Sequence, residues 1–159
     1  MKNKRTLLWQ SFAWALAGLY QATATQRNLR IHLVATGWVA WLGAQLELDG
    51  VQWTILLLTC GIVIITELLN SAVEALTNHL IPYRNDDAKA AKDIAAGAVL
   101  AGSIIALCAG IALLWQPDKL LALWQALISR PLHLTLMALA VTLCLKFIFG
   151  IKHNKEKPC

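Results

Sequence analysis

Polar and apolar positions divide the chain into one mixed N-terminal segment and four apolar runs. Over residues 5–30 apolar side chains such as Leu8, Phe12 and Leu19 recur at helical spacing, but polar side chains interrupt them too often for a membrane span. Trp9 and Trp14 are residues of the type that anchors a helix at the membrane interface. The pattern predicts an amphipathic helix within residues 1–30 that lies on the membrane surface.

The four apolar runs predict membrane-spanning helices, because about 20 apolar residues suffice to cross the hydrocarbon. They cover roughly residues 31–48, 53–80, 94–115 and 131–151. Residues 120–128, between the last two runs, are expected to form a short helix at the interface. We therefore expect an all-α integral membrane protein in three parts: the surface helix, a core of three spans over residues 31–115, and residues 116–159 with a fourth span and a basic tail.

The composition excludes a soluble globular domain. Apolar residues make up 58% of the chain and charged residues 14%, whereas a typical soluble domain has about 25% charged residues. The mean hydropathy of +0.57 supports the same conclusion. The net charge of +5 does not indicate nucleic-acid binding, because the basic residues lie mostly at the termini and beside the apolar runs. With four spans, this distribution predicts that both termini are cytoplasmic.

The second predicted span contains charged and polar residues, although the rest of it is apolar. Glu67, Asn70, Glu74 and Asn78 follow one another at helical spacing and therefore share one face. A carboxylate in the hydrocarbon costs roughly 2.5–3.5 kcal/mol on the insertion scale. Polar residues can also join helices together, and for Asn70 alone that interpretation is equally good. Two acids on one face instead favour a site that binds a metal or cation or moves a proton.

Two further polar clusters flank the core spans. Lys92 and Asp93 open the third predicted span, where the N–H groups of a helix N-terminus can bind an anion, and small residues follow at 95–98. Taken alone, Lys92 is better explained as a lysine at the membrane boundary. Gln26 and Arg30 lie one turn apart before the first span. The end of a surface helix in contact with lipid headgroups explains this pair at least as well as a site does.

The order of these three segments resembles the prokaryotic diacylglycerol kinase family. The family motifs are matched by Asn-x-Arg-Ile-His at residues 28–32, Glu-Leu-Leu-Asn-Ser-Ala-x-Glu at residues 67–74 and Ala-Lys-Asp-Ile-Ala-Ala-Gly-Ala-Val-Leu at residues 91–100. The likeness covers roughly residues 8–115, and the form of the first motif is most similar to the undecaprenol kinase branch. The fourth span lies outside the part that matches.

The resemblance implies a homotrimeric kinase of the bacterial cytoplasmic membrane with active sites at subunit interfaces. Such an enzyme would use Mg²⁺ and transfer the ATP γ-phosphate to a lipid hydroxyl, with undecaprenol or a related polyprenol as the expected acceptor. The resemblance implies that Glu67 is the catalytic base and that Asn70 orients the reacting groups. The other implied roles are metal binding by Glu74 and Gln26, and nucleotide or phosphate binding by Lys92, Asp93, Trp14 and Arg30.

One departure from the family pattern keeps other hypotheses open. Where the family has a second metal-binding Glu, this chain has Gln26, whose neutral amide is a weaker Mg²⁺ ligand than a carboxylate. Diacylglycerol is the alternative lipid acceptor. Two alternatives of another class are an ion or proton pathway built on the same acids and a structural membrane subunit without activity. An ion pathway would not depend on Lys92, whereas a kinase would.

Overall fold

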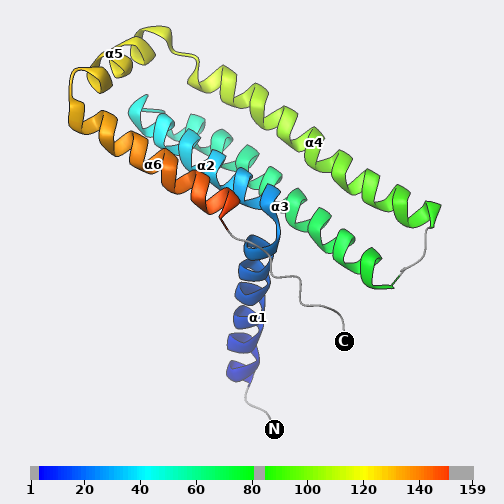
Figure 1. The fold of residues 1–159 in the computed structure, drawn as a ribbon. Coiled ribbons are helices and arrows are strands. Elements are labelled where there is room, and N and C mark those ends of the chain that lie inside the picture. Colours follow the sequence, from blue (N-terminus) through cyan, green and yellow to red (C-terminus); the bar gives the residue numbers. More distant parts are fainter. Residues whose placement is uncertain (1–3, 81–84, 151–159) are drawn as a thin grey trace.

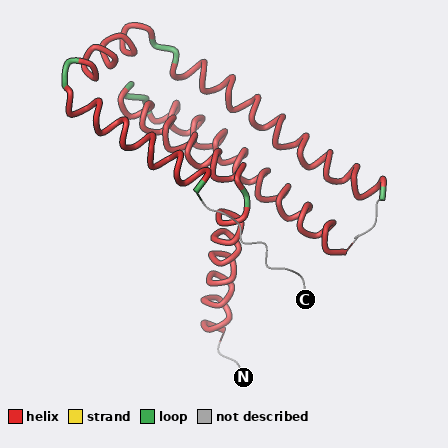
Figure 2. Tube along the Cα trace, in the orientation of Figure 1, coloured by secondary structure: helices red, strands yellow, loops and turns green. Residues whose placement is uncertain are grey.

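The computed structural model describes residues 4–80 and 85–150, and in these ranges the chain forms helices and no strand (Figures 1 and 2). The all-α prediction is therefore confirmed. The helices are α1 (Lys4–Thr25), α2 (Arg27–Gln45), α3 (Gly50–Leu80), α4 (Asp86–Leu114), α5 (Pro117–Ile128) and α6 (Pro131–Phe149).

The long antiparallel pair of α3 and α4 forms the largest interhelical contact of the molecule. Helix α2 packs against α3, and α6 packs against α2, so that α2 lies between the hairpin and the C-terminal helix (Figure 1). The short α5 crosses the end of the bundle between α4 and α6, and α1 leaves the bundle at the start of α2. Gly102 of α4 faces Ile62 and Thr66 of α3, with 3.6 Å from its ideal Cβ position to each, which is ordinary packing distance.

Three described helices, α3, α4 and α6, are long and apolar enough to cross a membrane. They correspond to the second, third and fourth predicted spans. The first predicted span, residues 31–48, forms most of α2, which is not one of the three. Its 19 residues include Arg27, Arg30 and His32, and these polar positions lower its hydropathy. Helix α2 packs against both α3 and α6, although its own surface is not continuously apolar.

The N-terminal helix ends earlier than residues 1–30 suggest. Helix α1 stops at Thr25, and Gln26 has an extended backbone (φ −100°, ψ 110°) before α2 begins at Arg27. The hydroxyls of Thr23 and Thr25 bond back to carbonyls one turn earlier within α1. The large exposed apolar side chains of α1 other than Trp14 lie within about one third of the helix circumference, at about 100° per residue.

The third predicted span also begins earlier than expected, and this corrects the interpretation of Lys92 and Asp93. The Asn85 side chain caps α4 by accepting hydrogen bonds from the backbone N–H of Asp87 (2.8 Å) and of Ala88 (3.2 Å). The helix therefore starts about two turns before Lys92. The N–H groups of residues 92 and 93 are used within the helix and do not form a helix N-terminus for an anion.

A small core fixes the end of the bundle beside α5. Leu46, Leu48, Leu56 and Leu114 are buried together there. The turn between α2 and α3 is closed by a reciprocal cap, in which the Asp49 carboxylate accepts from Gln52 N–H and the Gln52 amide oxygen accepts from Asp49 N–H, each at 2.9 Å. These contacts set the register between α2 and α3, and thereby the height of α2 beside the polar face of α3.

Candidate active site on the α3–α4 hairpin

The polar face of α3 runs from the interior of the bundle to its free end. Glu67 is only 2% exposed, Asn70 is half-buried, and Glu74 and Asn78 are exposed. With 31 residues, α3 is about 46 Å long at 1.5 Å per residue, whereas the hydrocarbon core is about 30 Å thick. Helix α3 is thus longer than the hydrocarbon is thick, and its polar face leads from the buried Glu67 to the exposed Glu74 and Asn78 toward the free end of the helix.

Glu67 is buried without a partner in the part of the chain that the structure describes. No hydrogen bond or ion pair joins its carboxylate to another described residue. One turn further, the Ser71 hydroxyl is also buried and has no hydrogen-bond partner among those residues. Buried polar groups are normally paired, so two unpaired groups on adjacent turns indicate a place where a ligand supplies the missing bonds.

Ser71 is the residue that the sequence analysis did not single out. It follows Glu67 by four positions, and this spacing alone places it on the same face. Serine is common between membrane helices, however, and its burial becomes evident only from the packing of α3 in the bundle.

Lys92 reaches the exposed end of the polar face. Its ammonium group donates a hydrogen bond to the Asn78 side-chain oxygen, which joins α4 to α3. The fold thus brings together two of the predicted clusters at one end of the hairpin. Asp93 is exposed and lies about 100° further around α4, because a helix turns by that angle per residue. Lys92 and Asp93 therefore project in different directions.

The start of α2 lies level with Glu67. Helix α2 has 19 residues and runs antiparallel to α3, so its first residue is level with the nineteenth residue of α3, Leu68. Gln26, which precedes α2, is half-buried at this height. Trp14 is 69% exposed on α1, which projects from the bundle (Figure 1), so the single chain does not bring it to the polar face.

Arg30 is 4% exposed and bonds to backbone carbonyls at two helix ends. Its Nη1 donates to the carbonyls of Thr23 (2.9 Å) and Ala24 (3.0 Å), and its Nε donates to that of Ile148 (3.2 Å). The last carbonyls of a helix lack partners within the helix and carry its negative dipole end, so a guanidinium satisfies both needs. Arg30 thereby joins α1, α2 and α6.

The charged groups suit a metal that is shared with phosphates. Among residues 4–80 and 85–150, no three His, Cys, Asp or Glu side chains come together as a metal cage. Mg²⁺ does not need such a cage, because it commonly binds one or two carboxylates together with substrate phosphates. The exposed Glu74 carboxylate offers one such ligand, whereas the Asn78 side-chain oxygen one turn away already accepts a hydrogen bond from Lys92.

Comparison with known proteins gives a family match over most of the helical core. A family model described as "Prokaryotic diacylglycerol kinase" matches residues 13–114. A Synechocystis sp. protein named diacylglycerol kinase is 42% identical over 108 residues, which are 67% of this chain and 62% of that protein. The chain thus spans less than two thirds of this relative.

Two other relatives are matched over nearly their whole length. The Bacillus subtilis protein named undecaprenol kinase is 34% identical over 110 residues, 69% of this chain and 89% of that protein. The Escherichia coli protein named diacylglycerol kinase is 27% identical over 111 residues, 70% of this chain and 91% of that protein. No solved structure matches the chain. The family match ends at residue 114, the last residue of α4, so that α5 and α6 lie outside it.

Proposed function

Because the chain belongs to the prokaryotic diacylglycerol kinase family, we propose that it transfers the γ-phosphate of ATP to the hydroxyl group of a membrane lipid. The family assignment made from the motifs is confirmed, and the names of the relatives support an ATP-dependent lipid kinase. The observation that carries the proposed chemistry is Glu67, a buried carboxylate without a described partner on a helix long and apolar enough to cross a membrane.

Glu67 is the proposed general base. Its carboxylate takes the proton of the lipid hydroxyl while the alcohol oxygen bonds to the γ-phosphorus, and the bond from that phosphorus to the oxygen bridging to the β-phosphate breaks to release ADP. A base must reach the proton that it removes, and Glu67 lies deeper than Glu74 on the same face. A lipid alcohol that enters from the membrane side can meet it there. Asn70, one turn further, is the proposed orienting group.

The nucleotide is proposed to bind at the exposed end of the hairpin. Phosphoryl transfer depends mainly on positioning and on neutralising charge, and the Lys92 ammonium group is held at that end by Asn78. Glu74 and the Gln26 amide are the proposed Mg²⁺ ligands, and the ion when bound would neutralise phosphate charge. Asp93 and Trp14 remain proposed nucleotide contacts. For Arg30 we propose an indirect role, since its hydrogen bonds to backbone carbonyls hold the α1–α2 junction.

A homotrimer in the bacterial cytoplasmic membrane, with sites between subunits and cytoplasmic termini, is part of the same proposal. Helix α3 extends past the start of α2, so α2 of the same chain does not cover its last turns, where Glu74 and Asn78 are exposed (Figure 1). Most large apolar side chains of α3 and α4 are exposed in the single chain. A second copy would cover part of this surface and complete the site.

Undecaprenol or a related polyprenol is the proposed acceptor, and diacylglycerol is the second candidate. The first motif, residues 28–32, favours the polyprenol, and the B. subtilis relative carries the matching name. The name of the Synechocystis relative favours diacylglycerol.

The proposal is tested by offering purified full-length protein Mg-ATP with undecaprenol or diacylglycerol and measuring phosphorylated lipid. Wild-type protein should phosphorylate one lipid in strong preference to the other, and Glu67→Gln should lower turnover of both by about 10²–10⁴-fold. Glu47→Gln is the matched control, because Glu47 is an exposed acid at the opposite end of the bundle. Failure to phosphorylate any lipid alcohol, or full activity of Glu67→Gln, would refute the kinase mechanism.

A further inference from the structure

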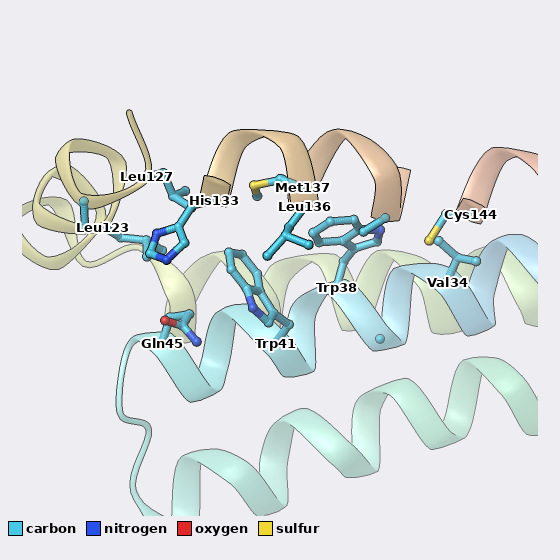
Figure 3. Close-up of a pocket in the computed structure, with 13 residues that line it drawn as sticks. Val34, Trp38, Trp41, Gln45, Leu123, Leu127, His133, Leu136, Met137 and Cys144 are labelled. Carbon is cyan, nitrogen blue, oxygen red and sulfur yellow. The ribbon is translucent and has the colours of Figure 1, made fainter. Parts of the chain in front are cut away.

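Helix α6, which the family match does not include, has its buried contact at its last turn. A groove of about 600 Å³ lies between α2 and α6, and α6 lines it with residues from His133 to Cys144 (Figure 3). Among the residues of α6, all of which the structure describes, Ile148 is the one that is buried, at 8% exposure. The end of α6 that holds it to the bundle is therefore the end beside the start of α2 (Figure 1).

The last turn of α6 contacts both arginines at the start of α2. Nε of Arg30 donates a buried hydrogen bond of 3.2 Å to the carbonyl of Ile148. The guanidinium of Arg27 lies 6.0 Å from the ring centre of Phe149. Carbonyls of a last helical turn lack partners within their own helix, so Arg30 satisfies one that would otherwise be unpaired. The end of α6 is thus bound to the first turn of α2 through its backbone and through a side chain.

Arg30 connects the end of α6 to the end of α1. Nη1 of the same guanidinium donates to the carbonyls of Thr23 and Ala24, at 2.9 Å and 3.0 Å. A guanidinium is planar and its donors point in fixed directions, so all three bonds form well only when both helix ends are in place. Gln26 interrupts the helical backbone between α1 and α2, so the angle between these helices depends on contacts such as those of Arg30.

We propose that the end of α6 is a positioning element for the metal side of the active site. It holds Arg30, Arg30 holds the joint between α1 and α2, and this joint keeps Gln26 level with the polar face of α3. The inference rests on the proposed function, in which Gln26 is a Mg²⁺ ligand, and it adds a task for a helix outside the family match. The positioning acts on the joint itself and is the same whether Gln26 meets Glu74 of its own chain or of a second copy.

Gln26 is the proposed ligand that most needs such support. Its neutral amide is a weaker ligand than a carboxylate, and Mg²⁺ demands a near-ideal octahedral geometry. A weak ligand adds affinity only when its position is fixed before the ion binds, because ordering it during binding offsets the gain. The half-buried Gln26 side chain forms no hydrogen bond with another described residue, and it does not cap α2. Its oxygen is therefore available to an ion, and the joint supplies the order that the side chain lacks.

Ile148→Ala tests the inference, with Leu145→Ala as the matched control. Both remove an apolar side chain from α6, but Leu145 is 50% exposed whereas Ile148 is buried. Two readouts on full-length protein in micelles need no turnover: hydrogen–deuterium exchange over residues 22–30, and Mn²⁺ binding measured by EPR with a non-hydrolysable ATP analogue. In Ile148→Ala the exchange should be faster, and the Kd for Mn²⁺ should rise about tenfold, an effect typical of residues that orient a metal ligand. Leu145→Ala should match the wild type in both readouts.

A double-mutant cycle with Gln26 separates positioning from a general defect in folding. Lipid phosphorylation at varied Mg²⁺ concentration should show a raised KM for Mg²⁺ in Ile148→Ala, with kcat at saturating Mg²⁺ near that of the wild type. In the Gln26→Ala background, Ile148→Ala should raise this KM no further, because the ligand that it positions is absent. Gln26→Glu supplies a stronger ligand and should reduce the effect of Ile148→Ala. A general folding defect would instead lower kcat alike in all backgrounds.

Phe149→Leu is a milder variant that decides the question if Ile148→Ala does not fold. Phe149 is 61% exposed, so its replacement opens no core and removes only the ring beside the Arg27 guanidinium. Exchange over residues 22–30 and the Kd for Mn²⁺ should both rise, by smaller factors than in Ile148→Ala. If neither changes, the last turn of α6 does not hold the joint.

Several results would overturn the inference. Unchanged exchange over residues 22–30 in Ile148→Ala would show that α6 does not hold the joint. Faster exchange with unchanged Mn²⁺ binding would show that the joint positions no metal ligand. Equal effects of Ile148→Ala with and without Gln26 would assign them to the fold as a whole. A wild type that phosphorylates no lipid alcohol would refute the proposed kinase, whereas the exchange and Mn²⁺ readouts would still decide this inference.

Discussion

Two buried charges, Arg30 and Glu67, have opposite surroundings in this molecule. Both side chains are almost completely buried, at 4% and 2% exposure. The Arg30 guanidinium bonds to three backbone carbonyls from two other helices. The Glu67 carboxylate has no hydrogen-bond or ion-pair partner among the described residues, and the unpaired Ser71 hydroxyl lies one turn away.

The difference separates a charge that supports the fold from one that is available for chemistry. A buried charge is tolerated when its bonds are satisfied, and it then holds the groups that satisfy it. A buried charge without partners lowers stability, and a folded chain keeps it where a ligand or reaction uses it. On this comparison, changes at Arg30 should affect the fold first, and changes on the polar face of α3 should affect activity first.

After Glu67 itself, Lys92 gives the largest expected effect. Lys92→Met should lower kcat/KM by about 10²–10³-fold, because removing one preorganised donor to a reacting phosphate has an effect of that size. The unfolding midpoint should change little, since one exposed hydrogen bond to Asn78 is lost. Initial rates at varied ATP concentration give the measurement. Lys89→Met, an exposed lysine one turn earlier on α4, is the control and should keep wild-type rates.

Arg30 tests the statement that a buried charge with satisfied hydrogen bonds supports the fold. Arg30→Met should lower the free energy of unfolding by about 2–4 kcal/mol, because charge-assisted hydrogen bonds to three buried or part-buried carbonyls are lost. Arg30→Lys should recover only part of that loss, since a single ammonium cannot reproduce the spread of the guanidinium donors. SDS-driven unfolding in mixed micelles measures both. Unchanged stability in Arg30→Met would show that the contacts with α1 and α6 contribute nothing to the fold.

Replacing Ser71 should change stability less than replacing Arg30, and in the direction of a more stable protein. Ser71→Ala should leave stability unchanged or raise it by up to about 1 kcal/mol, because it removes a buried hydroxyl that has no partner among the described residues. Activity should fall if the hydroxyl contacts substrate. The same unfolding assay, with lipid phosphorylation measured in parallel, checks both parts. A loss of stability would mean that Ser71 is satisfied within the folded protein.

Arg27 should show the smallest effect. It is exposed at the start of α2, and its guanidinium lies 6.0 Å from the ring centre of Phe149. An exposed contact between a cation and an aromatic ring contributes about 0.5–1 kcal/mol, so Arg27→Leu should change stability by no more than that. Measured beside Arg30→Met, it tests whether burial and carbonyl bonding matter more than positive charge at this junction.

Much of the fold and of the polar face could be predicted because they depend on local pattern. The apolar runs locate α3 and α6 to within a few residues, and the spacing of Glu67, Asn70 and Glu74 places them on one face of α3. The short helix expected over residues 120–128 is α5, which starts three residues earlier at Pro117, a residue suited to a helix start.

The remaining features depend on contacts between distant parts of the chain or on single caps. Arg30 bonds to Ile148, 118 positions away, and no local pattern indicates that the end of α6 lies beside it. The break at Gln26 has no glycine or proline to mark it. Asn85 and the two acids that follow it mark the start of α4 in the sequence. The predicted boundary lies at Ile94 instead, because the apolar run begins only there.

The most direct test of the central claim measures activity and stability together in Glu67→Gln. Lipid phosphorylation should fall by about 10²–10⁴-fold, the range of general-base contributions, because an amide cannot accept the hydroxyl proton. The free energy of unfolding should stay within about 0.5 kcal/mol of wild type or rise, since a buried charge without a described partner is replaced by a neutral group. Wild-type activity in Glu67→Gln, or a loss of stability as large as that predicted for Arg30→Met, would contradict the account.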